Sequence, residues 1–282
     1  MKLTNSEADI FVPDGIEIAE ALERTTHLAI VAHQDDLEIL AFHGIKECYK
    51  SKTNWFTGVV CGDGAGSPRA GKYANYSDAE MRKVRREEQR AAAKLGEYSA
   101  VIQLDYSSAR IKDQKEKNAI ESDLIKTLEN TLADTVYLHN PCDSHDSHVA
   151  VFARSLAALR KLNKNARPKQ VWGCEVWRDL DWLTGTDKKA LAVSGQDDLA
   201  RELCAIFDSQ VSGGKRYDLA TLARRQAHAT FSASHAADTE TALTLATDLM
   251  PLLNDPALSS AEFASRLIAR FSQDVLARLG KY

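Results

Sequence analysis

Several features that mark large protein classes are scarce in this sequence of 282 residues. No run approaches the ~18 consecutive apolar residues of a membrane span, and residues 1–15 lack the apolar core of a signal peptide. The five cysteines form no Cys-x-x-Cys pair, which argues against a disulfide framework or a cysteine zinc site and fits a reducing compartment. We therefore expect a cytoplasmic protein with no membrane partner.

The sequence also lacks a basic excess, because its formal net charge is −4. A nucleic-acid footprint needs clustered cations to neutralise phosphates, so we expect no nucleic-acid partner. Charged residues make up 27% of the chain and hydrophobic residues 44%, which is typical of an ordinary globular protein. The length suits one large domain or a domain with an appendage.

Short apolar runs alternate with helical patterns along the first two thirds of the chain. Predicted strands cover residues 27–32, 55–61, 100–104, 135–139 and 169–176. Predicted helices cover residues 16–24, about 36–49, 77–96, 120–132 and 149–162, and Ser77 with Glu80 forms a capping box. This alternation predicts an α/β fold with a mostly parallel, Rossmann-like sheet and helices on both faces.

The pattern changes near residue 197, after which it is almost entirely helical, with a separate amphipathic stretch at 259–281. We expect two parts. Residues 1–196 form the α/β domain that carries the chemistry, and residues 197–282 form a helical C-terminal extension that packs on it, either within the same domain or as a cap.

Two polar clusters follow predicted strands. His33, Asp35 and Asp36 come directly after the strand at 27–32, and His145 and His148 follow the strand at 135–139 after a short loop. Because ligands bind outside the carboxyl ends of strands in open parallel sheets, both clusters lie where a site is expected.

Two imidazoles and one carboxylate, with a fourth position left for water, are typical of a catalytic zinc site. The same nitrogen and oxygen donors accept other divalent metals, such as Fe²⁺. A helix N-cap is the ordinary alternative for Asp35 and Asp36, but it does not account for His33.

These motifs resemble those of the PIG-L/LmbE-like deacetylase family. That family's first motif is Ala-His-Pro-Asp-Asp-x-Glu, and residues 32–38 read Ala-His-Gln-Asp-Asp-Leu-Glu. Its second motif is usually His-Pro-Asp-His, and residues 145–148 read His-Asp-Ser-His. Further similarities lie in the glycine-rich stretch at 59–66 and in Gln226-Ala227-His228, so the resemblance extends over roughly residues 27–235.

The resemblance implies a Zn²⁺-dependent hydrolase that removes an acetyl group from an N-acetylated amino sugar of the GlcNAc type, free or in a glycoconjugate. The implied roles are metal ligation by His33, Asp36 and His148, general base catalysis by Asp35, electrophilic or acid assistance by His145, and substrate binding by Arg69 and His228. Beside a metal and a helix N-terminus, Asp35 is expected to stay anionic and to be a weak base.

The sequence departs from the family at three places. Gln34 replaces a proline, the second motif lacks its Pro-Asp pair, and residues 107–109 read Ser-Ser-Ala where many relatives have Pro-Asp-Gly. No predicted ligand is lost, but a carboxylate that contacts the sugar is missing, so the substrate stays open.

Other interpretations remain at this point. The chain could be a metal-dependent amidase for another small N-acyl compound, or a sugar- or nucleotide-binding α/β module without turnover. Residues 62–66 could line a sugar pocket or form a plain loop, and they lack the spacing of a phosphate-binding motif. Trp172, Trp177 and Trp182 could stack on a sugar, although core packing is the commoner role. A homo-oligomer is also left open.

Overall fold

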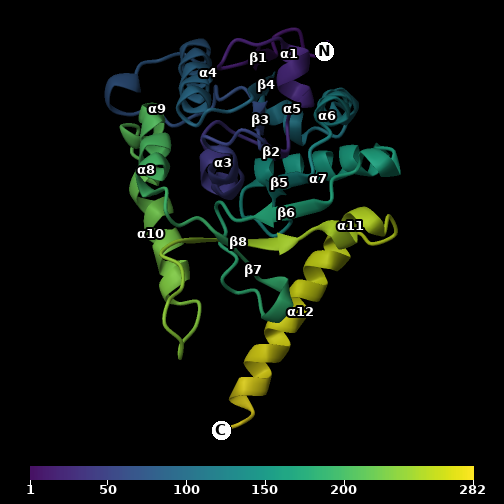
Figure 1. Cartoon of the computed structure of the whole chain (residues 1–282), viewed down its shortest axis with the longest axis vertical. Helices are drawn as coiled ribbons and strands as arrows, with labels where there is room; N and C mark the ends of the chain where they lie inside the picture. Colours follow the sequence, from purple (N-terminus) through teal and green to yellow (C-terminus); the bar gives the residue numbers. More distant parts are fainter.

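The computed structural model describes residues 1–282 and contains one eight-stranded sheet of order β1-β4-β3-β2-β5-β6-β8-β7 (Figure 1). Strands β4, β3, β2, β5 and β6 run parallel, β1 and β8 are antiparallel to β4 and β6, and β7 pairs antiparallel with β8. The strands are β1 (Asp9–Phe11), β2 (His27–Val31), β3 (Phe56–Gly62), β4 (Ala100–Tyr106), β5 (Thr135–His139), β6 (Gln170–Cys174), β7 (Lys189–Ala192) and β8 (Leu243–Asp248). The predicted mostly parallel sheet is confirmed.

The helices largely follow the predicted pattern, and the capping box of Ser77 and Glu80 is present. The helix expected at about 36–49 is two helices, because Ala41 leaves the helical region with φ −107° and ψ 16°. The helices are α1 (Ile18–Glu23), α2 (Asp36–Leu40), α3 (Phe42–Cys48), α4 (Asp78–Leu95), α5 (Ser108–Lys112), α6 (Lys117–Thr131), α7 (Asp146–Lys161), α8 (Asp197–Ile206), α9 (Asp208–Val211), α10 (Tyr217–Thr230), α11 (Met250–Asn254) and α12 (Ser260–Leu279).

Both faces of the sheet are covered, and β2 shows how. Successive side chains of a strand point to opposite faces. Leu28 and Ile30 join one core cluster, with residues of α1, α6 and α7, whereas Ala29 and Val31 join a second cluster, with residues of α3, α4 and α8. A strand buried on both faces reads as a continuous apolar run, which is the pattern of residues 28–32.

The order of the strands reverses beside β2. The chain moves from β2 to β3 and β4 on one side, and then returns to place β5 on the other side. A crevice forms at such a switch point, outside the carboxyl ends of the strands. One polar cluster follows β2 and the other follows β5, so the topology brings the two clusters to one edge of the sheet.

The C-terminal part contains one strand that the sequence did not predict. Strand β8 lies between β6 and β7, within a region that we expected to be almost entirely helical. Its six residues read Leu-Thr-Leu-Ala-Thr-Asp and are buried except for the half-buried Asp248, and periodicity alone does not separate so short a segment from a helical one. The helical extension itself is present, and the division at residue 196 stays a prediction. None of the helices combines the length and apolarity that a membrane crossing requires.

Candidate metal centre and active site

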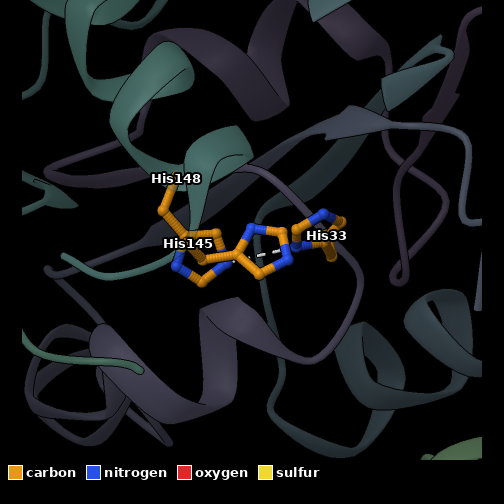
Figure 2. Close-up of side chains that lie close together, drawn as sticks. All are labelled: His33, His145 and His148. Atoms are coloured by element: carbon orange, nitrogen blue, oxygen red, sulfur yellow. Dashed lines mark hydrogen bonds between the residues drawn. The ribbon is translucent and has the colours of Figure 1, made fainter. Parts of the chain in front are cut away.

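The two predicted clusters meet in space. Asp36 begins α2. His33 lies in the turn after β2 and His148 in the first turn of α7, and Figure 2 shows their side chains beside each other and beside that of His145. The His33 Nδ1 atom is 3.2 Å from Asp36 Oδ2 and 3.2 Å from His148 Nε2, and the last two atoms are 3.3 Å apart. The three donor atoms therefore form a nearly equilateral triangle.

This triangle has the size of one face of a metal tetrahedron. Zinc binds nitrogen and oxygen donors at about 2.0–2.2 Å, so tetrahedral ligands are roughly 3.3–3.5 Å apart. The observed separations of 3.2–3.3 Å agree with that value. The residues present therefore fit a divalent cation, and their assignment as its ligands remains a prediction.

The local charges also favour a cation. Burial lowers the pKa of His148, but the carboxylates of Asp36 and Asp143 outweigh it and raise that pKa to about 9. Burial likewise acts to raise the pKa of Asp36, yet His148 and His33 hold it well below its usual range. A positive charge is thus stabilised where these side chains meet.

Two further histidines lie beside the triangle. Nitrogen atoms of His33, His145 and His148 lie within 4.8 Å of one another, as do donor atoms of Asp36, His139 and His148. The buried His139 accepts the backbone N–H of Ala32 at its Nε2 atom, 3.0 Å away, so that lone pair is already used. Its ring stacks on His148 with centroids 3.9 Å apart, which is a supporting contact.

Asp35 is placed differently from its neighbour. Its side chain accepts a hydrogen bond of 2.8 Å from buried Arg85, and its backbone N–H donates to the side chain of Gln89. Its φ of 82° is unusual for a residue other than glycine and is the kind of strain found at functional sites. Burial raises the pKa of Asp35 to about 6, although Arg85 opposes the shift. The expectation of an especially weak base is therefore not supported.

The replacement of the family's proline by Gln34 has a structural role. The Gln34 amide donates to the carbonyl of Gly62 and to the side chain of Gln103, and it thereby ties the turn after β2 to its neighbours. Gly64 lies close above it with φ +73°, and a Cβ there would lie 2.7 Å from both Gln34 Oε1 and Arg85 Cβ. Position 64 therefore accepts only glycine, because the loop passes too close to Gln34 and Arg85 for a larger side chain.

The triangle opens into a cavity of about 620 Å³. Asp35, His145 and Ser108 line it beside the candidate ligands His33 and Asp36, whereas the candidate ligand His148 is fully buried and is not part of the lining. Another part of the wall is formed by the segment that follows β6 and by residues in and just before α10. It includes Trp177, Lys215, Tyr217, Thr221 and Arg224. The volume lies within the range of small-molecule sites.

Two predicted substrate contacts have other partners. Arg69 donates to the carbonyl of Ala65 and pairs with Asp78, and His228 lies 3.0 Å from the carboxylate of Glu175. The cavity-lining residues include neither of them, so their roles in substrate binding stay predictions without geometric support.

Several residues that shape the site escaped the sequence analysis. Arg85 lies among the many charged residues of the helix predicted at 77–96, a pattern typical of a solvated helix face, yet it is 1% exposed and hydrogen-bonded to Asp35. Asp143, Lys215 and Tyr217 carried no local signal, because their relation to the site arises only when distant segments fold together. Trp177 was one of three tryptophans with two open roles, and the structure places it on the cavity wall.

Residues 28–159 match the family model of the GlcNAc-PI de-N-acetylases, PIG-L. The matched segment contains both motifs, and the predicted resemblance is confirmed. No curated protein matches the chain.

Solved structures with a similar fold include three that span most of the chain. A diacetylchitobiose deacetylase from Pyrococcus horikoshii has 15% identity and a TM-score of 0.60, covering 78% of this chain and 83% of that one. A conserved protein from Thermus thermophilus has 16% identity and a TM-score of 0.62, covering 83% and 99%. A 4-carboxy-2-hydroxymuconate hydratase from Pseudomonas putida has 16% identity and a TM-score of 0.61, covering 80% and 96%. At these identities the likeness establishes the fold alone.

Proposed function

We propose that this chain, PIG-L-like over residues 28–159, is a metal-dependent hydrolase that removes the acetyl group from an N-acetylated amino sugar of the GlcNAc type. The observation that carries the proposal is the triangle of donor atoms 3.2–3.3 Å apart at the edge of a cavity. Asp35 and His145 line the same cavity.

His33, Asp36 and His148 would hold the metal, which is Zn²⁺ or another divalent ion such as Fe²⁺. When bound, such an ion polarises the amide carbonyl and makes a water molecule more acidic. The ligand set is closed on one side by the buried His139 and is open toward the cavity, so a substrate reaches it from one direction.

Asp35 is the proposed general base. Its carboxylate borders the cavity, and its pKa of about 6 leaves it largely ionised at neutral pH. It accepts a proton from the water that attacks the acetyl carbon. Arg85 holds the carboxylate in place through the hydrogen bond of 2.8 Å. General base catalysis of this kind contributes about 10²–10⁴-fold.

His145 is the proposed partner of the carbonyl oxygen and of the leaving amine. Its Nδ1 atom is buried and has no hydrogen-bond partner within the protein. Burial, followed by the nearby His148 and His33, lowers its pKa, so a neutral ring is favoured. The ring N–H donates a hydrogen bond to the developing oxyanion. As the C–N bond breaks, the amine nitrogen takes up a proton from this ring, and the proton that Asp35 took from the water replaces it.

Trp177 is the proposed platform for the sugar ring. Its indole is 45% exposed and stacks at 28° to the ring of His145, with centroids 5.9 Å apart. An apolar ring face beside the reacting groups is suited to the C–H face of a pyranose. Tyr217 meets the indole edge-on at 6.4 Å and limits its movement.

The fold does not select the reaction by itself, since a hydratase shares it. Two other activities therefore remain as alternatives: hydrolysis of another small N-acyl compound, and binding without turnover. The presence of both Asp35 and His145 at the cavity favours turnover over a binding module.

Acetate release tests the proposal. Protein loaded with zinc or iron(II) is incubated with N-acetylglucosamine, diacetylchitobiose and N-acetyl thiol conjugates, and acetate and free amine are quantified. We expect product from an amino sugar, loss of product after chelation, and no bound metal in His148→Ala. Product from the thiol conjugates alone would support the amidase alternative. No product from any N-acyl compound would disprove the hydrolase.

A further inference from the structure

The last helix carries an apolar ridge that continues beyond the body of the protein. In α12 the side chains of Phe263, Leu267, Phe271, Val275 and Leu279 follow one another at i, i+4 spacing. The first two are buried, with 7% and 2% exposure, whereas the last three are 38%, 37% and 67% exposed. Figure 1 shows the C-terminal half of α12 extending away from the sheet and the other helices.

The supporting contacts end near the middle of the helix. Phe271 packs edge-on against Trp182, and Arg270 pairs with Asp187. Beyond residue 271, the hydrogen bonds and ion pairs of the helix, such as Arg278 with Asp274, are all internal to it. An unsupported stretch of this length is marginal as an isolated helix, so its apolar side needs a partner surface.

The exposed ridge is complementary to itself. Consider a second copy of α12 that runs antiparallel to the first, with the two-fold axis passing beside Val275 of both copies. Each residue then meets the residue of the second copy that lies the same number of positions from Val275 on its other side. Phe271 then faces Leu279, and Ile268 lies opposite Tyr282, just past the end of α12, so these apolar residues meet apolar residues. Leu276, to one side of the ridge, lies opposite Asp274. Such a self-complementary patch is the requirement for a two-fold symmetric interface.

We infer that α12 pairs with α12 of a second copy of this chain in an antiparallel, two-fold arrangement centred on Val275. The exposed side chains of Ile268, Phe271, Val275, Leu279 and Tyr282 together bury on the order of 1,000 Å² in such a pair, near the lower limit of a specific interface. The dimer is therefore a reversible one.

The charges of α12 favour a protein partner over a membrane surface. A helix that binds anionic lipid presents unpaired cations on its polar side. Here Arg266 pairs with Glu262, Arg270 with Asp187, and Arg278 with Asp274. The whole chain also carries a net charge of −4, which opposes attraction to an anionic lipid surface.

A cysteine at the axis tests the register. Helices packed about 8–10 Å apart, with Cα atoms about 2.3 Å from each axis, leave roughly 3.4–5.4 Å between the two Val275 Cα atoms, and the upper part of this range allows a disulfide. Mild oxidation of Val275→Cys is expected to give a covalent dimer on non-reducing gels. Ala277→Cys, on the opposite side of the helix, and the wild type with its native cysteines are the matched controls, and neither is expected to give a covalent dimer on these gels.

A charge-swap pair tests the predicted contact. Ile268→Lys and Tyr282→Glu each place a charge in the interface, and each alone is expected to weaken self-association at least tenfold in sedimentation velocity. Mixing the two variants is expected to restore a heterodimer, because the introduced lysine of one chain then faces the introduced glutamate of the other. Circular dichroism verifies that each variant is folded.

Three results would overturn the inference: a wild type that is monomeric across micromolar concentrations, equal cross-linking of Val275→Cys and Ala277→Cys, or no heterodimer in the mixture. Co-sedimentation of a monomeric wild type with phosphatidylserine vesicles would assign the ridge to a membrane surface instead.

Discussion

The Oδ2 atom of Asp143 lies 3.4 Å from Nδ1 of His148, on the side of the ring opposite the candidate metal position. The same carboxylate accepts the backbone N–H groups of His145 and Trp177, at 2.9 and 3.2 Å. The one buried carboxylate of Asp143 thus orients the side chain of His148 and the backbone at His145 and Trp177. A carboxylate behind a ligating histidine fixes its tautomer and orientation.

Replacing Asp143 with asparagine should weaken metal binding. The substitution keeps the size of the side chain but removes the charge that supports His148, and the loss of such a partner typically costs 10–100-fold in metal affinity. Competition with a chromophoric chelator measures this affinity. Asp146→Asn is the matched control, because Asp146 lies in the same segment but is exposed. Equal affinities in the two variants would remove Asp143 from the support of the site.

Replacing Asp35 with asparagine should slow turnover without releasing the metal. Asp35 is 7% exposed and hydrogen-bonded to Arg85, and its neighbour Asp36, rather than Asp35, is the proposed metal ligand. We expect kcat to fall about 10²–10⁴-fold, as is usual for loss of a general base, while metal content by elemental analysis stays at the wild-type level. Normal kcat with metal bound would exclude Asp35 as the base.

Glu38 should make the fold less stable as pH rises. Burial raises its pKa to about 8, although Tyr98 and Gln89 donate hydrogen bonds to its Oε1 atom. The folded state therefore holds a proton that the unfolded chain releases above its ordinary pKa of about 4.3. Stability contributed by this group is present at low pH and is lost between about pH 4.5 and pH 8.

Glu38→Gln should remove that dependence, because the amide oxygen still accepts from Tyr98 and Gln89 but does not ionise. Between pH 5 and pH 8, the free energy of unfolding of the wild type is expected to fall by on the order of 4 kcal/mol more than that of the variant. Urea unfolding at several pH values measures the difference. A difference between the two proteins that does not vary with pH would show that Glu38 has an ordinary pKa.

Trp177→Ala should raise KM for an amino-sugar substrate by roughly 5- to 10-fold, the equivalent of one lost ring contact of about 1–1.4 kcal/mol. If the indole only binds the sugar, kcat should change little. Trp177→Phe keeps a flat ring and should recover most of the affinity. A fall in kcat with unchanged KM would instead indicate that Trp177 acts by holding the ring of His145, which it stacks against.

The parts of the fold that the sequence predicted are those with strong local signals. The five parallel strands appear as apolar runs, because strands buried on both faces have no polar alternation. Ser77 and Glu80 marked a helix start that the structure confirms. Strand β8 was missed because its six residues lie in a helix-rich region, and so short a segment has no decisive period. Antiparallel β1 and β7 are shorter still, with three and four residues.

The amino-acid sequence alone determined which candidate donors the chain offers, since His33, Asp36 and His148 are recognisable as donor side chains that follow strands. Only the tertiary structure decided that their donor atoms lie 3.2–3.3 Å apart, that Arg85 is buried against Asp35, and that Asp143 supports His148. The reason is physical. A donor's chemistry belongs to its side chain, whereas its distance to a partner more than a hundred residues away depends on strand order and packing.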